Sequence, residues 1–170
     1  PLWFEEPCAP DRPHEMARVA AQTSIPVATG ERLTTVSEFA ALGRHQAASI
    51  WQPNLGRCGG ILAGKKIAAI AEANGCQIAP HLYSGPILGA ANIQLAATLP
   101  NLLIIEGIRE WGGFHAELLT TPIEWEAGYV IPSREPGLGV ELDEDVALAN
   151  PWPDQPGGPL HLSMVPDPVR

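Results

Sequence analysis

The motifs WFEEP at residues 3–7 and PVATGE at residues 26–31 each place a carboxylate at the end of an apolar run, and one helix-length segment separates them. A carboxylate placed just past a buried strand is costly to leave unpaired. Two of them in successive repeats therefore indicate a cation or a proton shared between the two strand ends. The alternative is a pair of solvated acids at helix N-termini, where negative charge complements the helix dipole.

Short apolar runs alternate with longer amphipathic segments from residue 2 to residue 106, which is typical of repeated βα units on a parallel sheet. Strands that are covered on both faces are mostly apolar, as these runs are. Five strands are predicted, at residues 2–5, 26–29, 49–52, 77–80 and 102–105. Helices are predicted between them, at residues 14–22, 36–42, 61–73 and 86–97.

The sequence changes in character after residue 110. Residues 123–130 alternate loosely, residues 136–139 are rich in turn formers, and the last ~20 residues are crowded with proline and glycine. We therefore expect two parts: residues 1–110, with the βα units and the candidate site, and residues 111–170, with closing strands and an extended C-terminal arm.

Five consecutive βα units predict a (β/α) barrel, in which functional side chains gather at the C-terminal ends of the strands. A closed barrel of this kind has eight strands, so the chain would hold the last five. The rival architecture is an open, doubly wound five-stranded sheet, which would be complete at this length. No GxGxxG motif follows the first predicted strand to indicate a dinucleotide site there.

Composition narrows the classes of function. The formal net charge of -9 and the pI near 4.9 argue against a nucleic-acid partner, which requires clustered Lys and Arg. No apolar run approaches the ~20 residues of a membrane span. Three cysteines without CxxC spacing indicate reduced thiols. We expect a cytoplasmic protein, because a strand-like segment begins at once and no secretory leader precedes it.

Every predicted strand is followed by a polar side chain, and the combination indicates an active site more strongly than any single match. Oxygen ligands suit Mg²⁺, although two carboxylates are too few and a third ligand is expected from a strand before residue 1. The alternative for His81 is a structural hydrogen bond, and for Glu106 an ion pair with Arg109 or Arg32. The candidates are Glu5, Glu6, Glu31, Arg32, Asn54, His81 and Glu106.

The motifs resemble, in order and spacing, those of the mandelate racemase and muconate lactonizing enzyme family of the enolase superfamily. They are WFEEP at 3–7, GERL at 30–33, QPNLGRCGGI at 52–61, APHLYSGP at 79–86 and LLIIEG at 102–107. The resemblance implies strands four to eight of a (β/α)7β TIM barrel. The N-terminal capping domain and the first barrel strands would then lie outside this chain.

The resemblance also implies roles for the candidate residues. Glu5 and Glu31 would be magnesium ligands, with Glu6 and Arg32 supporting the metal shell or the substrate. His81, Glu106 and Asn54 would form the catalytic group, with His81 as acid/base and Glu106 assisting at the substrate. The family removes a proton alpha to a carboxylate, with the metal stabilising an enediolate.

Within the family, the stretch at residues 85–97 is most similar to galactonate dehydratase-like enzymes, which act on sugar acids. We therefore expect a Mg²⁺-dependent acid-sugar dehydratase, a homo-oligomer in its full-length form. One alternative is a racemase, epimerase or cycloisomerase of a hydroxy acid. Another is a catalytically silent chain that needs a second chain to complete the barrel.

Asn54 departs from the family pattern, since many relatives with this histidine place an aspartate there. An amide does not stabilise an imidazolium as a carboxylate does, so His81 is expected to be a poorer base. This disfavours two-base racemisation more than dehydration. If Asn54 orients the ring through its carbonyl oxygen instead, a neutral tautomer persists.

Overall fold

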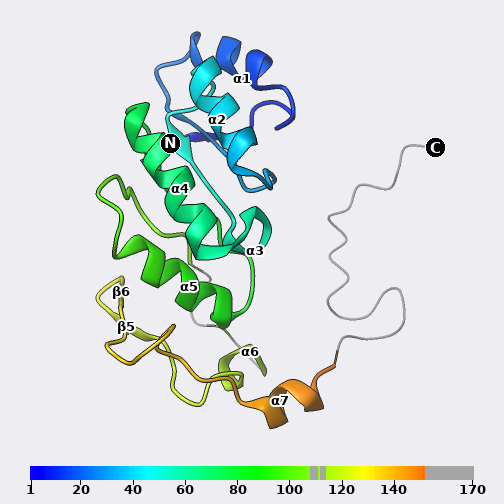
Figure 1. The fold of residues 1–170 in the computed structure, drawn as a ribbon, viewed down its shortest axis with the longest axis vertical. Helices are drawn as coiled ribbons and strands as arrows, with labels where there is room; N and C mark the ends of the chain where they lie inside the picture. The colour runs from blue at the N-terminus through cyan, green and yellow to red at the C-terminus, as the bar shows by residue number, and fades with distance from the viewer. Residues whose placement is uncertain (108–110, 112–113, 152–170) are drawn as a thin grey trace, which may run out of the picture.

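Four parallel strands form a sheet in which neighbours in sequence are neighbours in space. The strands are β1 (Phe4–Glu5), β2 (Val27–Thr29), β3 (Ile50–Trp51) and β4 (Gln77–Ile78), in the order β1-β2-β3-β4. The computed structural model, shown in Figure 1, describes residues 1–107, 111 and 114–151. In register, Glu5 lies opposite Ala28, Ala28 opposite Ile50, and Trp51 opposite Ile78. The carboxyl ends of the four strands therefore meet at one edge, and the predicted parallel βα organisation is confirmed.

The predicted strand at residues 102–105 is wrong in extent. Leu102 forms an isolated parallel bridge with Ile78, and the Leu103 amide donates to the Ile78 carbonyl at 2.8 Å. Within the described residues, no strand pairs with the other side of this segment. A segment with one neighbour makes fewer ladder hydrogen bonds, so apolar composition alone overestimated the strand.

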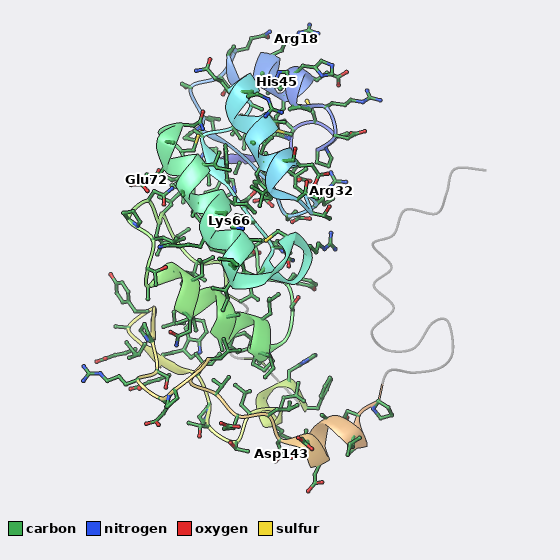
Figure 2. All side chains as sticks on the ribbon, viewed as in Figure 1. Arg18, Arg32, His45, Lys66, Glu72 and Asp143 are labelled. Atoms are coloured by element: carbon green, nitrogen blue, oxygen red, sulfur yellow. The ribbon has the colours of Figure 1, made fainter. Side chains whose placement is uncertain are left out.

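Four longer helices lie beside one another in chain order and cover the sheet (Figure 1). They are α1 (Pro13–Ala20), α2 (Val36–His45), α4 (Gly60–Ala73) and α5 (Pro86–Ala96). Thr35 and Glu38 form a capping box that begins α2. Lys66 and Glu72 lie on the exposed side of α4 (Figure 2). None of the helices in the described ranges combines the length and apolar character needed to cross a bilayer.

A short helix, α3 (Leu55–Cys58), follows β3 and was not predicted. Four residues are too few to show helical periodicity in a sequence. The one feature that could have indicated this helix is its N-cap residue, Asn54, whose side chain accepts a hydrogen bond from the Gly56 amide.

The core lies between the helices and one face of the sheet. Phe39 and Trp51 are fully buried there, with ring centroids 5.9 Å apart. Cys58 and Cys76 belong to the same cluster, and burial raises the pKa of both thiols. A raised pKa keeps these thiols protonated and unreactive.

After residue 107 the chain forms smaller elements: α6 (Phe114–Glu117), β5 (Glu124–Glu126), β6 (Tyr129–Ile131) and α7 (Glu144–Ala149). Strands β5 and β6 pair as an antiparallel hairpin. Its two-residue turn, Ala127 and Gly128, has φ values of 49° and 87°, as a type I′ turn requires. The predicted alternation at residues 123–130 thus becomes a hairpin. Of the predicted C-terminal arm, residues 152–170 lie outside the described residues.

Candidate active site

The position of the candidate site follows from the way side chains alternate between the two faces of a strand. Successive strand residues point to opposite faces, so residues two apart share a face. Away from the main core, one cluster gathers Trp3, Ala28, Ile50, Ala79 and Leu103. The residues that lie two positions after Trp3, Ala28, Ile50 and Ala79 in the sequence are Glu5, Gly30, Gln52 and His81, respectively. The apolar cluster therefore supports a polar layer at the carboxyl ends of the strands.

His81 is held from one side by Asn54. The Asn54 Oδ1 accepts from the Gly56 amide at 2.9 Å, which turns its Nδ2 toward His81 Nδ1 at 2.8 Å. Because Nδ2 can only donate, Nδ1 accepts, and the neutral ring carries its hydrogen on Nε2. Asn54 thus orients the ring through its amide nitrogen, and the alternative orientation through the carbonyl oxygen is not the one observed.

Two carboxylates face the other nitrogen of His81. The Nε2 atom lies 3.1 Å from Glu31 Oε2 and 4.0 Å from Glu106 Oε2. Glu106 Oε2 also accepts from the Leu82 amide at 2.7 Å. Three of the predicted residues, from three separate βα units, therefore meet at one ring nitrogen.

The alternative pairing of Glu106 with Arg32 does not occur, because Arg32 pairs with Glu6. Arg32 Nη2 lies 2.7 Å from Glu6 Oε2, and Thr29 Oγ1 donates to Glu6 Oε1 at 3.2 Å. Glu6 has a φ of 40°, a left-handed value that is uncommon for a residue with a side chain. This backbone turn directs Glu6 toward β2, apart from Glu5. Arg109, the other suggested partner of Glu106, lies outside the described residues.

Two buried amides belong to the site and were missed by the sequence analysis. Gln52 Nε2 donates to Glu5 Oε2 at 2.8 Å, and Asn92 Nδ2, on α5, donates to the His81 carbonyl at 3.2 Å. Gln52 is 5% exposed and Asn92 0%. The available signal was a polar residue within an otherwise apolar strand or helix, since buried polar groups need partners.

Comparison with known proteins places this arrangement in a family. The family model described as enolase C-terminal domain-like matches residues 1–146. The chain belongs to this family. The predicted resemblance and the predicted fold class, a C-terminal portion of an enolase-superfamily barrel, are confirmed.

Individual members of the enolase superfamily align with most of the chain. The D-galactonate dehydratase of Cronobacter sakazakii is 40% identical over 157 residues, covering 88% of this chain and 41% of that protein. A candidate mandelate racemase/muconate lactonizing enzyme structure from Labrenzia alexandrii is 63% identical with a TM-score of 0.87, covering 90% of this chain and 39% of that one.

A candidate galactarate dehydratase structure from Agrobacterium radiobacter, with bound Na and L-malate, is 29% identical with a TM-score of 0.79. The match covers 86% of this chain and 40% of that structure. The chain spans about two-fifths of the length of the curated relatives that it matches.

Carboxylates that could bind a cation are few in the described residues. Within residues 1–107, 111 and 114–151, no group of three or more His, Cys, Asp or Glu side chains is arranged to hold a metal ion. Glu5 and Glu31 nevertheless supply carboxylate oxygens at the ends of two neighbouring strands, β1 and β2. Oxygen donors of this kind fit Mg²⁺ or Ca²⁺, as part of a larger set.

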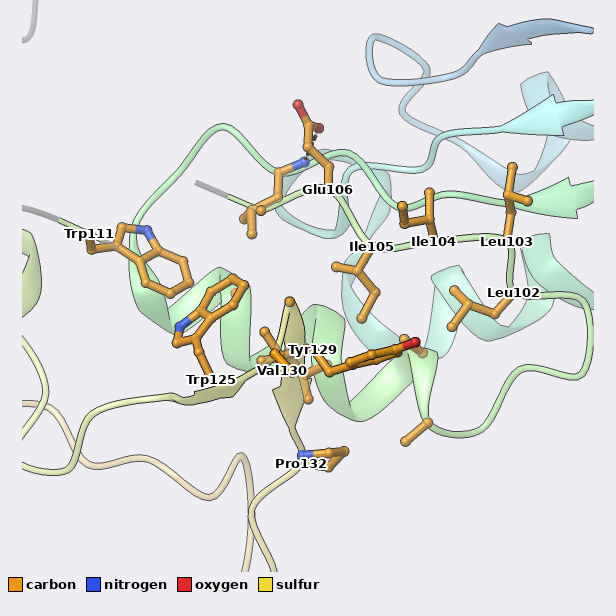
Figure 3. Close-up of a pocket in the computed structure, with 18 residues that line it drawn as sticks. Leu102, Leu103, Ile104, Ile105, Glu106, Trp111, Trp125, Tyr129, Val130 and Pro132 are labelled. Carbon is orange, nitrogen blue, oxygen red and sulfur yellow. Dashed lines mark hydrogen bonds between the residues drawn. The ribbon is translucent and has the colours of Figure 1, made fainter. Parts of the chain in front are cut away.

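One pocket of this enolase-superfamily chain lies apart from most of these polar groups. It measures about 640 Å³, and apolar side chains from residues 102–105, α5 and the β5–β6 hairpin line most of it. Of the predicted site residues, all of them described, Glu106 alone lines it, and its carboxylate points away from Trp111 and Trp125 (Figure 3). The described side chains that could take part in acid/base chemistry therefore lie at the strand ends, where His81 meets Glu31 and Glu106.

Proposed function

We propose that this chain forms the acid/base and part of the metal-binding region of an acid-sugar dehydratase, which removes the proton alpha to a carboxylate and eliminates water. The observation that supports this most is His81 Nε2 between the carboxylates of Glu31 and Glu106. The 40% identity to a D-galactonate dehydratase favours a sugar acid as the substrate. The activity belongs to the whole protein, of which residues 1–110 supply the barrel portion and residues 111–170 the closing segment.

Glu5 and Glu31 are the residues that would hold Mg²⁺ in this proposal, with the remaining protein ligand coming from outside the described residues. When bound, the ion would bring positive charge to the substrate carboxylate and so acidify the neighbouring C–H bond. The Agrobacterium radiobacter structure contains bound Na, which agrees with the cation site of this proposal.

His81 has the geometry of a donor toward the departing hydroxyl. Asn54 keeps Nδ1 an acceptor, so the hydrogen of the neutral ring sits on Nε2, the atom that faces the carboxylates. Asn92 holds the backbone of His81 through the His81 carbonyl. The next residue, Leu82, holds Glu106 through its backbone amide, so the positions of His81 and Glu106 are linked. The Nε2–H hydrogen bond would stabilise the negative charge that develops on the departing hydroxyl, and the proton that completes the water molecule balances the one removed from the alpha carbon.

Racemisation, epimerisation or cycloisomerisation is the second candidate, and the 63% identity to a candidate mandelate racemase/muconate lactonizing enzyme favours it. Two-base racemisation needs a histidine that readily accepts a proton. The Asn54 amide, which donates to Nδ1 and does not accept, gives less support to that role than a carboxylate would.

Product analysis separates these reactions. The complete gene product is incubated with Mg²⁺ and a panel of acid sugars and hydroxy acids, beginning with D-galactonate, and the products are followed by NMR. Dehydration yields a 2-keto-3-deoxy acid, whereas racemisation or epimerisation yields an isomer of unchanged mass. Turnover to isomers alone would replace dehydration with the second candidate, and no turnover of any acid would contradict both.

A further inference from the structure

Glu5 is oriented by two N–H donors that act on the same oxygen. Trp3 Nε1 and Gln52 Nε2 each donate to Glu5 Oε2, both at 2.8 Å. Among the described residues, Glu5 Oε1 has no hydrogen-bond partner. Two short, charge-assisted bonds to one oxygen fix the rotation of the carboxylate, and they decide which oxygen stays available.

Both donors are themselves held in place. Trp3 packs against the buried cluster of Ala28, Ile50 and Ala79. The backbone of Gln52 is fixed by its own N–H, which donates to the Thr29 carbonyl at 2.9 Å. Gln52 is 5% exposed, so its side chain has little freedom to turn away from Glu5. The two donors therefore present a fixed geometry to the carboxylate.

The identity of Gln52 is not explained by packing. Its Oε1 is buried and has no hydrogen-bond partner within the described residues, which is a cost that an aliphatic side chain of similar size would avoid. Rotating the side-chain amide to exchange Oε1 and Nε2 would not remove this cost, because Oε1 would then face the Glu5 carboxylate, which cannot donate a hydrogen bond to it. The amide at this position is therefore explained by the hydrogen bond that its Nε2 donates to Glu5.

We propose that Trp3 and Gln52 are positioning residues that reserve Glu5 Oε1 as a single coordinating oxygen for the cation. This inference rests on the proposed function, in which Glu5 is a ligand. Groups that orient a metal ligand typically contribute 10–100-fold to metal affinity. Removing either donor lets Glu5 rotate, so that the cation must order the carboxylate as it binds.

The test is calorimetric titration of the complete gene product with Mg²⁺, in parallel with urea unfolding. Gln52→Leu and Trp3→Phe each remove one N–H donor and keep most of the side-chain volume. Each is expected to weaken Mg²⁺ binding by roughly 10-fold or more, without a lower urea midpoint for Gln52→Leu. Gln94→Leu is the matched control, because Gln94 donates to the Leu138 carbonyl, far from Glu5 in the chain, and its loss is expected to leave Mg²⁺ affinity unchanged.

Glu5→Gln separates failure of this inference from failure of the proposed function. If Glu5→Gln abolishes binding while Gln52→Leu and Trp3→Phe bind as tightly as the wild type, Glu5 is a ligand and the positioning role is overturned. If all three variants bind Mg²⁺ like the wild type, Glu5 is not a ligand, and the proposed metal site fails together with this inference.

Discussion

Residues 1–107 and residues 114–151 differ in how their elements are held. Helices α2, α4 and α5 bury side chains against the sheet, whereas α6, β5 and α7 contain no buried residue. Leu119 is the one buried residue in the described range 114–151. A site needs side chains held by a rigid surround, and here each predicted site residue belongs to the part with the core. In the proposed function, the acid/base and metal-binding side chains among the described residues therefore all belong to the first part.

Replacing the central histidine tests this division most strongly. His81→Asn removes Nε2 from between Glu31 and Glu106, so turnover is expected to fall by roughly 10²–10⁴-fold. His115→Asn, on α6, is the matched control: His115 is half-buried beside Phe114, so its replacement is expected to affect stability more than turnover, which should stay within about tenfold of the wild type. Steady-state kinetics on the acid sugar identified by product analysis measures both. Equal losses would contradict the division of roles.

The same contrast applies to stability. Phe39→Ala removes a fully buried ring that packs against Trp51, and we expect a loss of about 3–5 kcal/mol in the free energy of unfolding. Leu148→Ala, on α7, changes a side chain that is 77% exposed, and a change within about 0.5 kcal/mol is expected. Urea unfolding measures both, and a large loss from Leu148→Ala would show a contact that holds the second part to the first.

Alanine substitutions at two glycines with positive φ, one in each part of the chain, are also expected to differ in their effect on stability. A Cβ at Gly30 (φ 135°) would lie 2.7 Å from Phe39 Cε1, so Gly30→Ala adds a clash of about 1–3 kcal/mol to backbone strain. A Cβ at Gly128 (φ 87°) meets nothing within 4 Å, so Gly128→Ala adds strain alone, about 1–2 kcal/mol. Gly30→Ala should therefore show the larger drop in urea midpoint, and the reverse order would mean that the region around Gly30 relaxes freely.

Helix caps provide the smallest effect. The Thr35 hydroxyl accepts from the Glu38 amide at 3.2 Å, and Thr35→Ala is expected to lower the free energy of unfolding by about 1 kcal/mol. Asp143 caps α7 in the same way, but α7 buries nothing, so Asp143→Ala is expected to cost less than about 0.5 kcal/mol. Urea unfolding of both variants at neutral pH tests this, and equal losses would contradict the contrast.

The Thr35 effect is also expected to depend on pH. The hydrogen bond from Thr35 is the main cause that lowers the pKa of Glu38 from its ordinary 4.5. A carboxyl with a lowered folded pKa stabilises the protein above its ordinary value, and this contribution is lost as pH falls through the folded value. The difference between wild type and Thr35→Ala should therefore narrow in acid. A difference that widens below pH 4.5 would contradict the assigned bond.

The sequence was sufficient to predict the positions of the strand ends, and with them Glu31, His81 and Glu106. Parallel strands bring their carboxyl ends together whatever the details of packing, so consecutive polar strand ends must converge. The extent of the strand at 102–105 was not predictable in this way. Apolar composition does not reveal whether a segment has a neighbour on one side or on both.

The supporting contacts lay beyond sequence reasoning because each depends on geometry between distant residues. Gln52 meets Glu5 across 47 positions of the chain, and the orientation of the Asn54 amide depends on the Gly56 backbone. The left-handed backbone of Glu6, which directs it to Arg32, has no signature in residue type. These details decide which atom of each residue faces the site.

A crystal structure of the complete gene product with Mg²⁺ and D-galactonate tests the central claim most directly. We expect the ion to be bound by Glu5 Oε1 and a Glu31 oxygen at about 2.0–2.1 Å, with His81 Nε2 facing a hydroxyl of the sugar acid. Binding of the ion away from Glu5 and Glu31, or a sugar acid that does not approach His81, would contradict the account.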